Sequence, residues 1–138
     1  MTAPVTLVTG LPGNGKTLHT ICSVKEWAER ENRQVYVHGI EILDKEALPW
    51  LEFDPAKWHE LPVGAIIVID EAHKVFPTRP VGSKVPPHVE AIGELRHQGH
   101  NLVLITQDGM SLDTEVRRRV GRHLQVQRRF GMQACAVF

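Results

Sequence analysis

Short apolar runs separated by polar, glycine-containing segments dominate the hydrophobic pattern of the chain. The clearest run is residues 65–69, whose continuous apolar character is typical of a parallel strand covered on both faces. Comparable runs predict further strands at residues 5–9, 35–37, 102–105, 123–127 and 132–138.

Three segments between these strands carry apolar residues near helical spacing. They predict helices over residues 16–30, 89–97 and 112–120. Residues 76–87, rich in Pro and Gly, are expected to form a loop. Strands that alternate with helices indicate an α/β fold with a mostly parallel sheet of five to six strands flanked by helices. The length of 138 residues fits one domain over residues 1–138.

The formal net charge is zero, but the two halves of the chain differ. Residues 1–69 hold 6 basic and 9 acidic residues, a balance of −3, and residues 70–138 hold 10 and 7, a balance of +3. The basic excess gathers near the end, in Arg117, Arg118, Arg119, Arg122, Arg128 and Arg129. This cluster is open to two interpretations: a surface for phosphate, nucleic acid or a neighbouring subunit, or a solvated basic edge.

The two cysteines, Cys22 and Cys135, lie far apart, so the sequence indicates neither a disulfide framework nor a cysteine metal site. This usage is typical of the reducing cytoplasm. No run is long and apolar enough to span a bilayer. Because the sequence stops in a strand-like segment, we expect this domain to be part of a longer protein.

A glycine-rich loop follows the first expected strand. Residues 10–17 fit the phosphate-loop pattern G-x-x-x-x-G-K-[ST] and stand between a strand and a helix, as that loop requires. Its glycines allow backbone N–H groups to approach phosphate oxygens, and the helix start adds its positive dipole end. The predicted phosphate-binding residues are Gly10, Leu11, Pro12, Gly13, Asn14, Gly15, Lys16 and Thr17. Lys16 is expected to reach the β and γ phosphates and the Thr17 hydroxyl to bind Mg²⁺.

Two acids, Asp70 and Glu71, end the most apolar strand. Ligands of open α/β sheets bind at the carboxyl ends of the strands, so Asp70 is expected to support the Mg²⁺ beside the phosphate loop. Glu71 is then placed to activate a water for attack on the γ phosphate. The pair favours a RecA-like ATPase. The guanine motif Asn-Lys-x-Asp is absent, which argues against a GTPase.

Other polar residues are expected to complete the site. Gln107 ends the strand at 102–105 and is predicted to sense the γ phosphate. RecA-like ATPases commonly take an arginine from the next subunit of a ring. The candidates for such an arginine are Arg96, Arg117, Arg118, Arg119 and Arg122. His73 completes a helicase-like Asp-Glu-Ala-His string, but one lobe is too little for such a helicase, so a local hydrogen bond is expected of it.

Three segments together resemble the N-terminal domain of the zonular occludens toxin (Zot) family, which is similar to the gene I assembly protein of filamentous phages. They are residues 10–17, residues 66–72, and residues 96–107 with the sequence Arg-His-Gln-Gly-His-Asn-Leu-Val-Leu-Ile-Thr-Gln. The resemblance covers nearly the whole chain. It implies a RecA-like fold that uses ATP to drive phage assembly and export through the host inner membrane. It also implies a membrane anchor and periplasmic part beyond this cytoplasmic domain.

We therefore predict an ATPase that uses ATP and Mg²⁺, in which Lys16, Glu71 and Gln107 are catalytic and Thr17 and Asp70 hold the metal. The expected partners are further copies of the chain in a ring, phage coat or assembly proteins, and single-stranded DNA. Two alternatives stay open: a nucleotide or small-molecule kinase with a lid at residues 76–87, and a nucleotide-gated interaction module without turnover.

Overall fold

The computed structural model describes residues 3–11, 15–128 and 135–137. One sheet runs through the described part in the order β3-β2-β4-β5-β1-β6-β7. Six strands are parallel and β7 is antiparallel to β6. The strands are β1 (Val5–Thr9), β2 (Val35–His38), β3 (Leu51–Glu52), β4 (Ile66–Ile69), β5 (Asn101–Thr106), β6 (Arg122–Arg128) and β7 (Cys135–Val137). The predicted α/β class with a mostly parallel sheet is confirmed.

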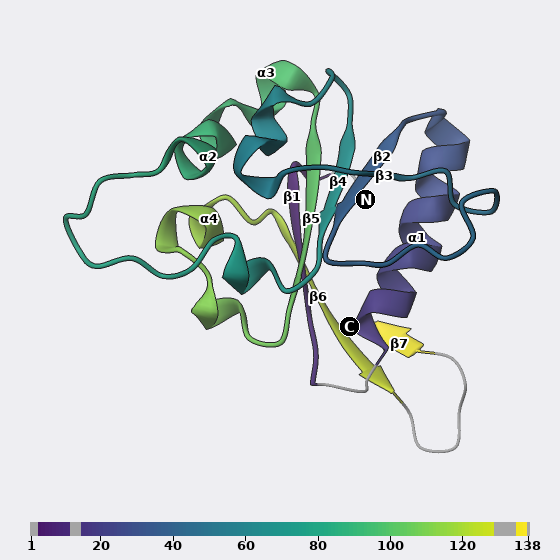
Figure 1. Cartoon of the computed structure of the whole chain (residues 1–138). Coiled ribbons are helices and arrows are strands. Elements are labelled where there is room, and N and C mark those ends of the chain that lie inside the picture. Colours follow the sequence, from purple (N-terminus) through teal and green to yellow (C-terminus); the bar gives the residue numbers. More distant parts are fainter. Residues whose placement is uncertain (1–2, 12–14, 129–134, 138) are drawn as a thin grey trace.

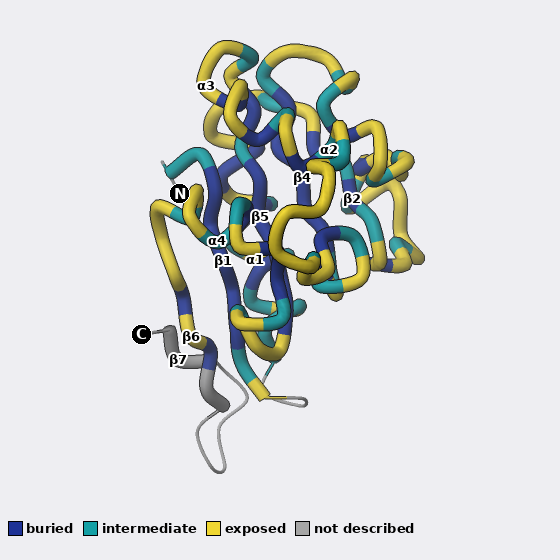
Figure 2. Tube along the Cα trace, turned by 90° about the vertical axis from the view of Figure 1, so that its left-hand side faces the viewer, coloured by how far each residue is buried: buried dark blue, intermediate teal, exposed yellow. Residues whose placement is uncertain are grey.

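Two apolar layers cover the two faces of the sheet, because successive side chains on a strand point to opposite faces. On β4, Ile67 and Ile69 belong to one layer and Ile66 and Val68 to the other. This explains why the central strands are apolar at every position. Figure 2 shows the buried residues following the strands, with exposed segments around them.

The helix α1 (Lys16–Glu31) covers one face alone among the described helices, as Figure 1 shows. Its buried residues Val24, Trp27 and Ala28 recur at helical spacing and pack on that face. The helix starts after Gly15 at φ 77° and stops at Asn32 at φ 52°, both left-handed. A left-handed residue is a common helix terminator, and asparagine tolerates it.

The opposite face carries short helical segments. They are η1 (Pro55–Glu60), η2 (Ala72–Lys74), α2 (Pro87–Glu90), η3 (Ala91–Glu94), α3 (Leu95–Gln98), η4 (Gly109–Ser111) and α4 (Thr114–Arg118). The helix expected at 89–97 is therefore α2, η3 and α3 in succession, with Gly93 in its middle. Glycine weakens a regular helix, and 3₁₀ turns are frequent in short connecting pieces.

Two local differences from the sequence expectations have clear causes. The basic helix expected at 112–120 begins only at Thr114, because the Asp113 side chain caps it by accepting from the Glu115 N–H (2.8 Å). Strand β3 was not predicted, since two exposed residues on a sheet edge leave no alternating pattern. Trp50 and Trp58 are buried and Phe53 is partly buried, so these aromatic residues pack on the domain. Within the described ranges, none of the helices has the length and apolarity to cross a membrane.

Candidate nucleotide-binding site

The predicted phosphate loop joins the carboxyl end of β1 to the amino end of α1, at the lower edge of the sheet in Figure 1. Pro12, Gly13 and Asn14 lie outside the described residues. On the near side, Gly10 approaches β6 so closely that a Cβ there would stand 2.7 Å from the Val126 carbonyl oxygen. Gly10 is therefore required by packing, whatever else it does.

Lys16 and Thr17 form the first turn of α1. The first N–H groups of a helix have no partner within it, and they carry the positive end of its dipole. A sixteen-residue helix that starts beside a glycine loop is therefore suited to bind an anion. The Lys16 side chain bends back over Gly10, where a Cβ would lie 3.8 Å from Lys16 Cδ.

Asp70 meets Thr17 across the edge of the sheet. Ile66 and Val68 point toward α1, and Asp70 continues that alternation to the same side. Its Oδ2 accepts a hydrogen bond from Thr17 Oγ1 at 3.1 Å, and its Oδ1 accepts from the Glu71 N–H at 2.8 Å. Residues 53 positions apart are thus brought together, as the two motifs predicted.

A hydroxyl and a carboxylate are oxygen ligands of the kind that Mg²⁺ prefers. Such a site commonly takes only one or two protein ligands and completes its shell with waters and substrate phosphates. In the described part of the chain no three His, Cys, Asp or Glu residues gather as a metal cluster. Thr17 and Asp70 therefore fit a magnesium ion shared with phosphate, rather than an ion held by protein alone.

Glu71 has the left-handed backbone of φ 50° and ψ 49°, which is rare outside glycine. This conformation breaks the strand alternation and turns the side chain toward Lys74, with which the carboxylate forms an exposed ion pair. A hydrogen bond from Lys74 is the main cause that lowers the pKa of Glu71, and the charges of Lys74, His73 and Lys16 add to it. Glu71 is therefore ionised at neutral pH, as a general base must be.

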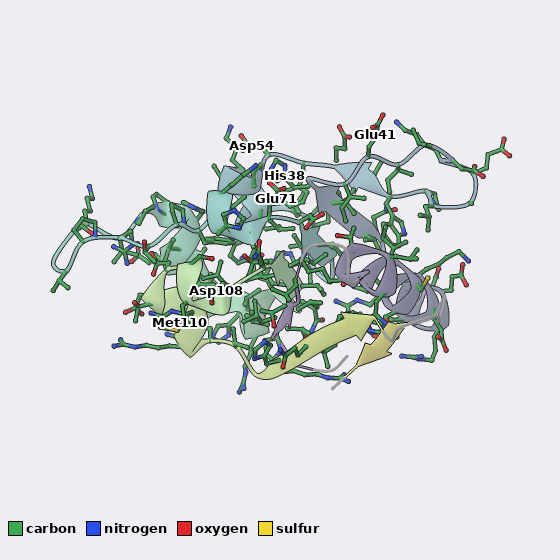
Figure 3. The ribbon with its side chains drawn as sticks, turned by 90° about the horizontal axis from the view of Figure 1, so that it is seen from below. His38, Glu41, Asp54, Glu71, Asp108 and Met110 are labelled. Carbon is green, nitrogen blue, oxygen red and sulfur yellow. The ribbon has the colours of Figure 1, made fainter. Side chains whose placement is uncertain are left out.

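Gln107 directly follows β5, the strand between β1 and β4, and its side chain is exposed. Within the described residues no hydrogen bond from its side chain reaches Thr17, Asp70 or Glu71. Figure 3 views the molecule from the side of the strands' carboxyl ends, where Glu71 and Asp108 both lie. Gln107 thus has the predicted place at the edge, and its role stays a prediction.

The sequence did not predict two contacts beside Glu71. One is the Lys74 ion pair, for which the spacing of three residues on a helical turn was a usable signal. The other is a hydrogen-bond contact of 3.0 Å between His73 Nδ1 and Thr106 Oγ1. No sequence signal joins residues 33 positions apart, although a local hydrogen bond was expected of His73.

The candidate arginines do not reach this site within their own chain. Arg96, Arg118 and Arg119 line a cavity of about 410 Å³ together with Pro4 and Val5, at the start of β1. That is the opposite end of the strand from the phosphate loop. Arg122 also stands at a strand start, paired with Thr6.

Arg117 is held locally. Its guanidinium donates to the Leu112 carbonyl oxygen (3.2 Å), to Met110 Sδ (3.1 Å) and to Thr114 Oγ1 (3.1 Å). Arg96, Arg118, Arg119 and Arg122 stand at the far end of the sheet, so any of them that completes a phosphate site would have to do so in a neighbouring copy.

Comparison with known proteins gives matches over most or all of the chain. The model of the family described as zonular occludens toxin (Zot) matches residues 50–136. A curated relative, the putative assembly protein ORF301 of Pseudomonas phage Pf3, is 35% identical over 140 residues. The match covers 97% of this chain and 46% of the relative, so the chain spans about half the length of that protein.

Solved structures share the fold. The N-terminal domain of zonular occludens toxin from Neisseria meningitidis superposes with a TM-score of 0.70 at 29% identity, covering 99% of this chain and 83% of that one. The genome packaging NTPase B204 of Sulfolobus turreted icosahedral virus 2, in complex with AMPPCP, has a TM-score of 0.70 at 17% identity. That match covers 94% of this chain and 77% of the other, and at this identity it shows the fold alone.

Proposed function

This chain belongs to the zonular occludens toxin (Zot) family, and on that premise we propose that it binds ATP with Mg²⁺ and hydrolyses it to drive phage assembly. The observation that carries the proposal is the 3.1 Å hydrogen bond from Thr17 Oγ1 to Asp70 Oδ2. It joins the start of the helix after the glycine loop to the end of the acidic strand. The bond brings together two oxygen ligands where the phosphates of a nucleotide would meet α1.

The first group of residues binds the phosphates and the metal ion. Gly10, Gly15 and the first-turn N–H groups of α1 bind the phosphate chain, and Lys16 places its ammonium on the β and γ phosphates. Thr17 and Asp70 would hold the Mg²⁺, which when bound would neutralise the charge that develops on the phosphates.

Glu71 acts as the general base. Its carboxylate leaves Lys74, accepts a proton from a water, and orients that water's oxygen toward the γ phosphorus as the bond to ADP breaks. Gln107, which follows β5 at the same edge of the sheet, would sense the γ phosphate. The exposed Lys74 pair is weak enough to break for this step, since pairs of this kind contribute about 0–1 kcal/mol.

Two substitutions test these roles. Lys16→Ala should abolish ATP binding in a calorimetric titration, whereas Glu71→Gln should keep wild-type binding and lose hydrolysis, because an amide cannot take the proton. Glu52→Gln, on the exposed edge strand β3, is the matched control and should keep both. Wild-type turnover in Glu71→Gln would remove the base from the mechanism.

One structural observation argues against the kinase alternative. The loop at 76–87 was the candidate lid, and its one arginine, Arg79, donates to the Asp113 carboxylate and to the Ser83 and Lys84 carbonyl oxygens. An arginine engaged in this way does not serve to clamp phosphates. Transfer of phosphate to an added nucleoside or small-molecule acceptor would restore the kinase interpretation. ATP binding without turnover at any protein concentration would support the interaction module.

The wider role of the protein is part of the same proposal. The curated relative is called an assembly protein, and B204 is called a genome packaging NTPase. We therefore place this domain on the cytoplasmic side of the host inner membrane, in a ring of copies that acts with coat or assembly proteins and single-stranded DNA. The membrane anchor implied by the family stays a proposal, since the chain spans 46% of that relative.

Turnover measured against protein concentration, with and without single-stranded DNA, tests the ring. A cooperative rise should appear if an arginine from the next copy completes each site. Arg119→Ala should then lower turnover when mixed in equal amounts with wild-type protein. A specific activity that is independent of concentration would argue against shared sites.

A further inference from the structure

A polar contact close to Glu71 in the sequence is made by His73. This half-buried residue lies in η2, two positions after Glu71, and its Nδ1 is 3.0 Å from Thr106 Oγ1. Thr106 is the last residue of β5, is 2% exposed, and directly precedes Gln107. The contact therefore joins the segment of the proposed base to the segment of the proposed phosphate sensor.

The turn after β5 is tied to the same hydroxyl. Thr106 Oγ1 lies 3.5 Å from Ser111 Oγ, and the Ser111 hydroxyl and N–H both donate to the Asp108 carbonyl oxygen. His73, Thr106 and Ser111 thus form a short polar row in an otherwise apolar layer. A shift of His73 would therefore displace Thr106 and, through Ser111, Asp108, which are the residues on either side of Gln107.

Strand pairing does not hold Glu71 in place. The ladder between β4 and β5 ends at the pair Ile69–Leu104, so Glu71 lies beyond it. Its left-handed conformation is unfavourable for a residue other than glycine and persists only if the residues that follow it are anchored. Within the turn, the Glu71 N–H donates to Asp70 Oδ1 (2.8 Å) and its carbonyl oxygen accepts from the Lys74 N–H (2.9 Å). Ala72 is buried, and the His73–Thr106 contact joins this turn to β5.

We propose that His73 is a positioning residue that sets the orientation of Glu71 relative to Gln107 through its hydrogen bond with Thr106. This inference rests on the proposed function and concerns the same site. Its importance follows from the chemistry of attack on the γ phosphate, where a displacement of about 1 Å can cost on the order of 100-fold in rate. In this proposal His73 acts through the backbone turn at residue 71 and not on the nucleotide itself.

The test removes the bond from either end. His73→Ala and Thr106→Val should each lower kcat about tenfold or more, with the dissociation constant of Mg–AMPPCP unchanged within about twofold. Because both remove one interaction, the double variant should lose no more than the worse single variant. His73→Asn, whose side-chain amide can lie near the place of Nδ1, should restore most of the rate.

Thr6→Val is the matched control. Thr6 lies on the neighbouring strand β1, is 1% exposed, and its hydroxyl has no hydrogen-bond partner among the described residues. The same loss of a buried hydroxyl should leave kcat at the wild-type value. Multiplying effects in the double variant, no rescue by asparagine, or a parallel loss of melting temperature and nucleotide affinity would overturn the proposal.

A second readout works even if the wild-type protein shows no turnover, in which case the hydrolysis proposal fails by itself. In amide NMR spectra, Thr106→Val should move the Glu71 N–H signal, and His73→Ala should move the Gln107 signals. Thr6→Val should move neither of them. Unchanged Glu71 and Gln107 signals in both variants would contradict the coupling directly.

Discussion

Asp70 and Asp113 are two aspartates that differ in how the protein compensates their charge. Asp113 lies beneath the 77–86 loop with 1% of its surface exposed, and it receives the Arg79 guanidinium and the Glu115 N–H. Asp70 is half-buried at the edge of the sheet and receives two neutral donors, a hydroxyl and an N–H. Asp113 has its charge compensated by the protein itself, whereas Asp70 does not.

This difference identifies Asp113 as a structural acid and supports the proposed metal-binding role of Asp70. Burial opposes ionisation of Asp113, but the hydrogen bonds from Arg79 and from backbone N–H groups outweigh it and lower its pKa. Because the Arg79 guanidinium already neutralises the Asp113 carboxylate, Asp113 is not suited to bind a metal ion. Asp70 keeps a carboxylate without a cation among the described residues, beside the anion-binding start of α1, so a magnesium ion would complete it.

The largest change in folding stability is expected at the ion pair between Arg79 and Asp113. Arg79→Met leaves the Asp113 charge buried without its cation, so the free energy of unfolding, measured with urea at neutral pH, should fall by more than the loss of a surface ion pair costs. Arg118→Met is the control, because Arg118 pairs with Glu115 on the surface (3.1 Å) and should cost under about 1 kcal/mol. Equal costs for the two variants would contradict the contrast.

The pH dependence follows from the same pair. Because the pKa of Asp113 is lowered on folding, its contribution to stability is present above the unfolded value of about 4 and is lost as the pH falls through the folded value. The difference in free energy of unfolding between the wild type and Arg79→Met should therefore become smaller below about pH 4.

A smaller loss of stability is expected at the other aspartate. Asp70→Asn should lower the free energy of unfolding by under about 1 kcal/mol at neutral pH, since the amide oxygen can accept in place of the carboxylate.

A smaller effect on stability is expected at Glu71. Glycine adopts φ 50° without strain, so the free energy of unfolding of Glu71→Gly should exceed that of Glu71→Ala by about 1 kcal/mol. Both variants should lose hydrolysis. Asn32, at φ 52° after α1, provides the same comparison away from the site, and its glycine variant should likewise exceed its alanine variant in stability. A less stable glycine variant at residue 71 would mean that the backbone there is unstrained.

The smallest effect concerns the Lys74 pair. Lys74→Met removes the main cause of the lowered pKa of Glu71, so that pKa should rise toward its ordinary value. A base acts only when ionised, and the acid limb of the kcat–pH profile should therefore move to higher pH, with little change at neutral pH. Lys25→Met, which breaks an ion pair with Glu29 on α1, should leave the profile in place.

Much of the fold was predictable because its signals are local. The central strands are apolar at every position since both faces are covered, and the start of α1 follows from the glycine loop. The division of residues 87–98 into three short pieces was not predictable, because a helical pattern does not distinguish α from 3₁₀ turns. The two exposed residues of β3 carry no pattern at all.

The candidate site divides in the same way. The pairing of Thr17 with Asp70 was anticipated, because two motifs that each have a known place in a parallel sheet imply that they meet. The left-handed backbone of Glu71 and the contact of His73 with Thr106 were not. They depend on how the chain turns after β4 and on which residue of β5 lies opposite, and both arise only from tertiary packing.

The central claim is that Thr17 and Asp70 together hold the magnesium ion of a bound nucleotide. The most direct test is a double-mutant cycle of Thr17→Val and Asp70→Asn. Calorimetry of each variant measures how much Mg²⁺ increases the affinity for ATP. Thr17→Ser keeps the hydroxyl and should keep the gain. The account predicts that each single variant loses most of the gain and that the double variant loses no more. Full retention of the magnesium-dependent gain in both single variants would contradict it.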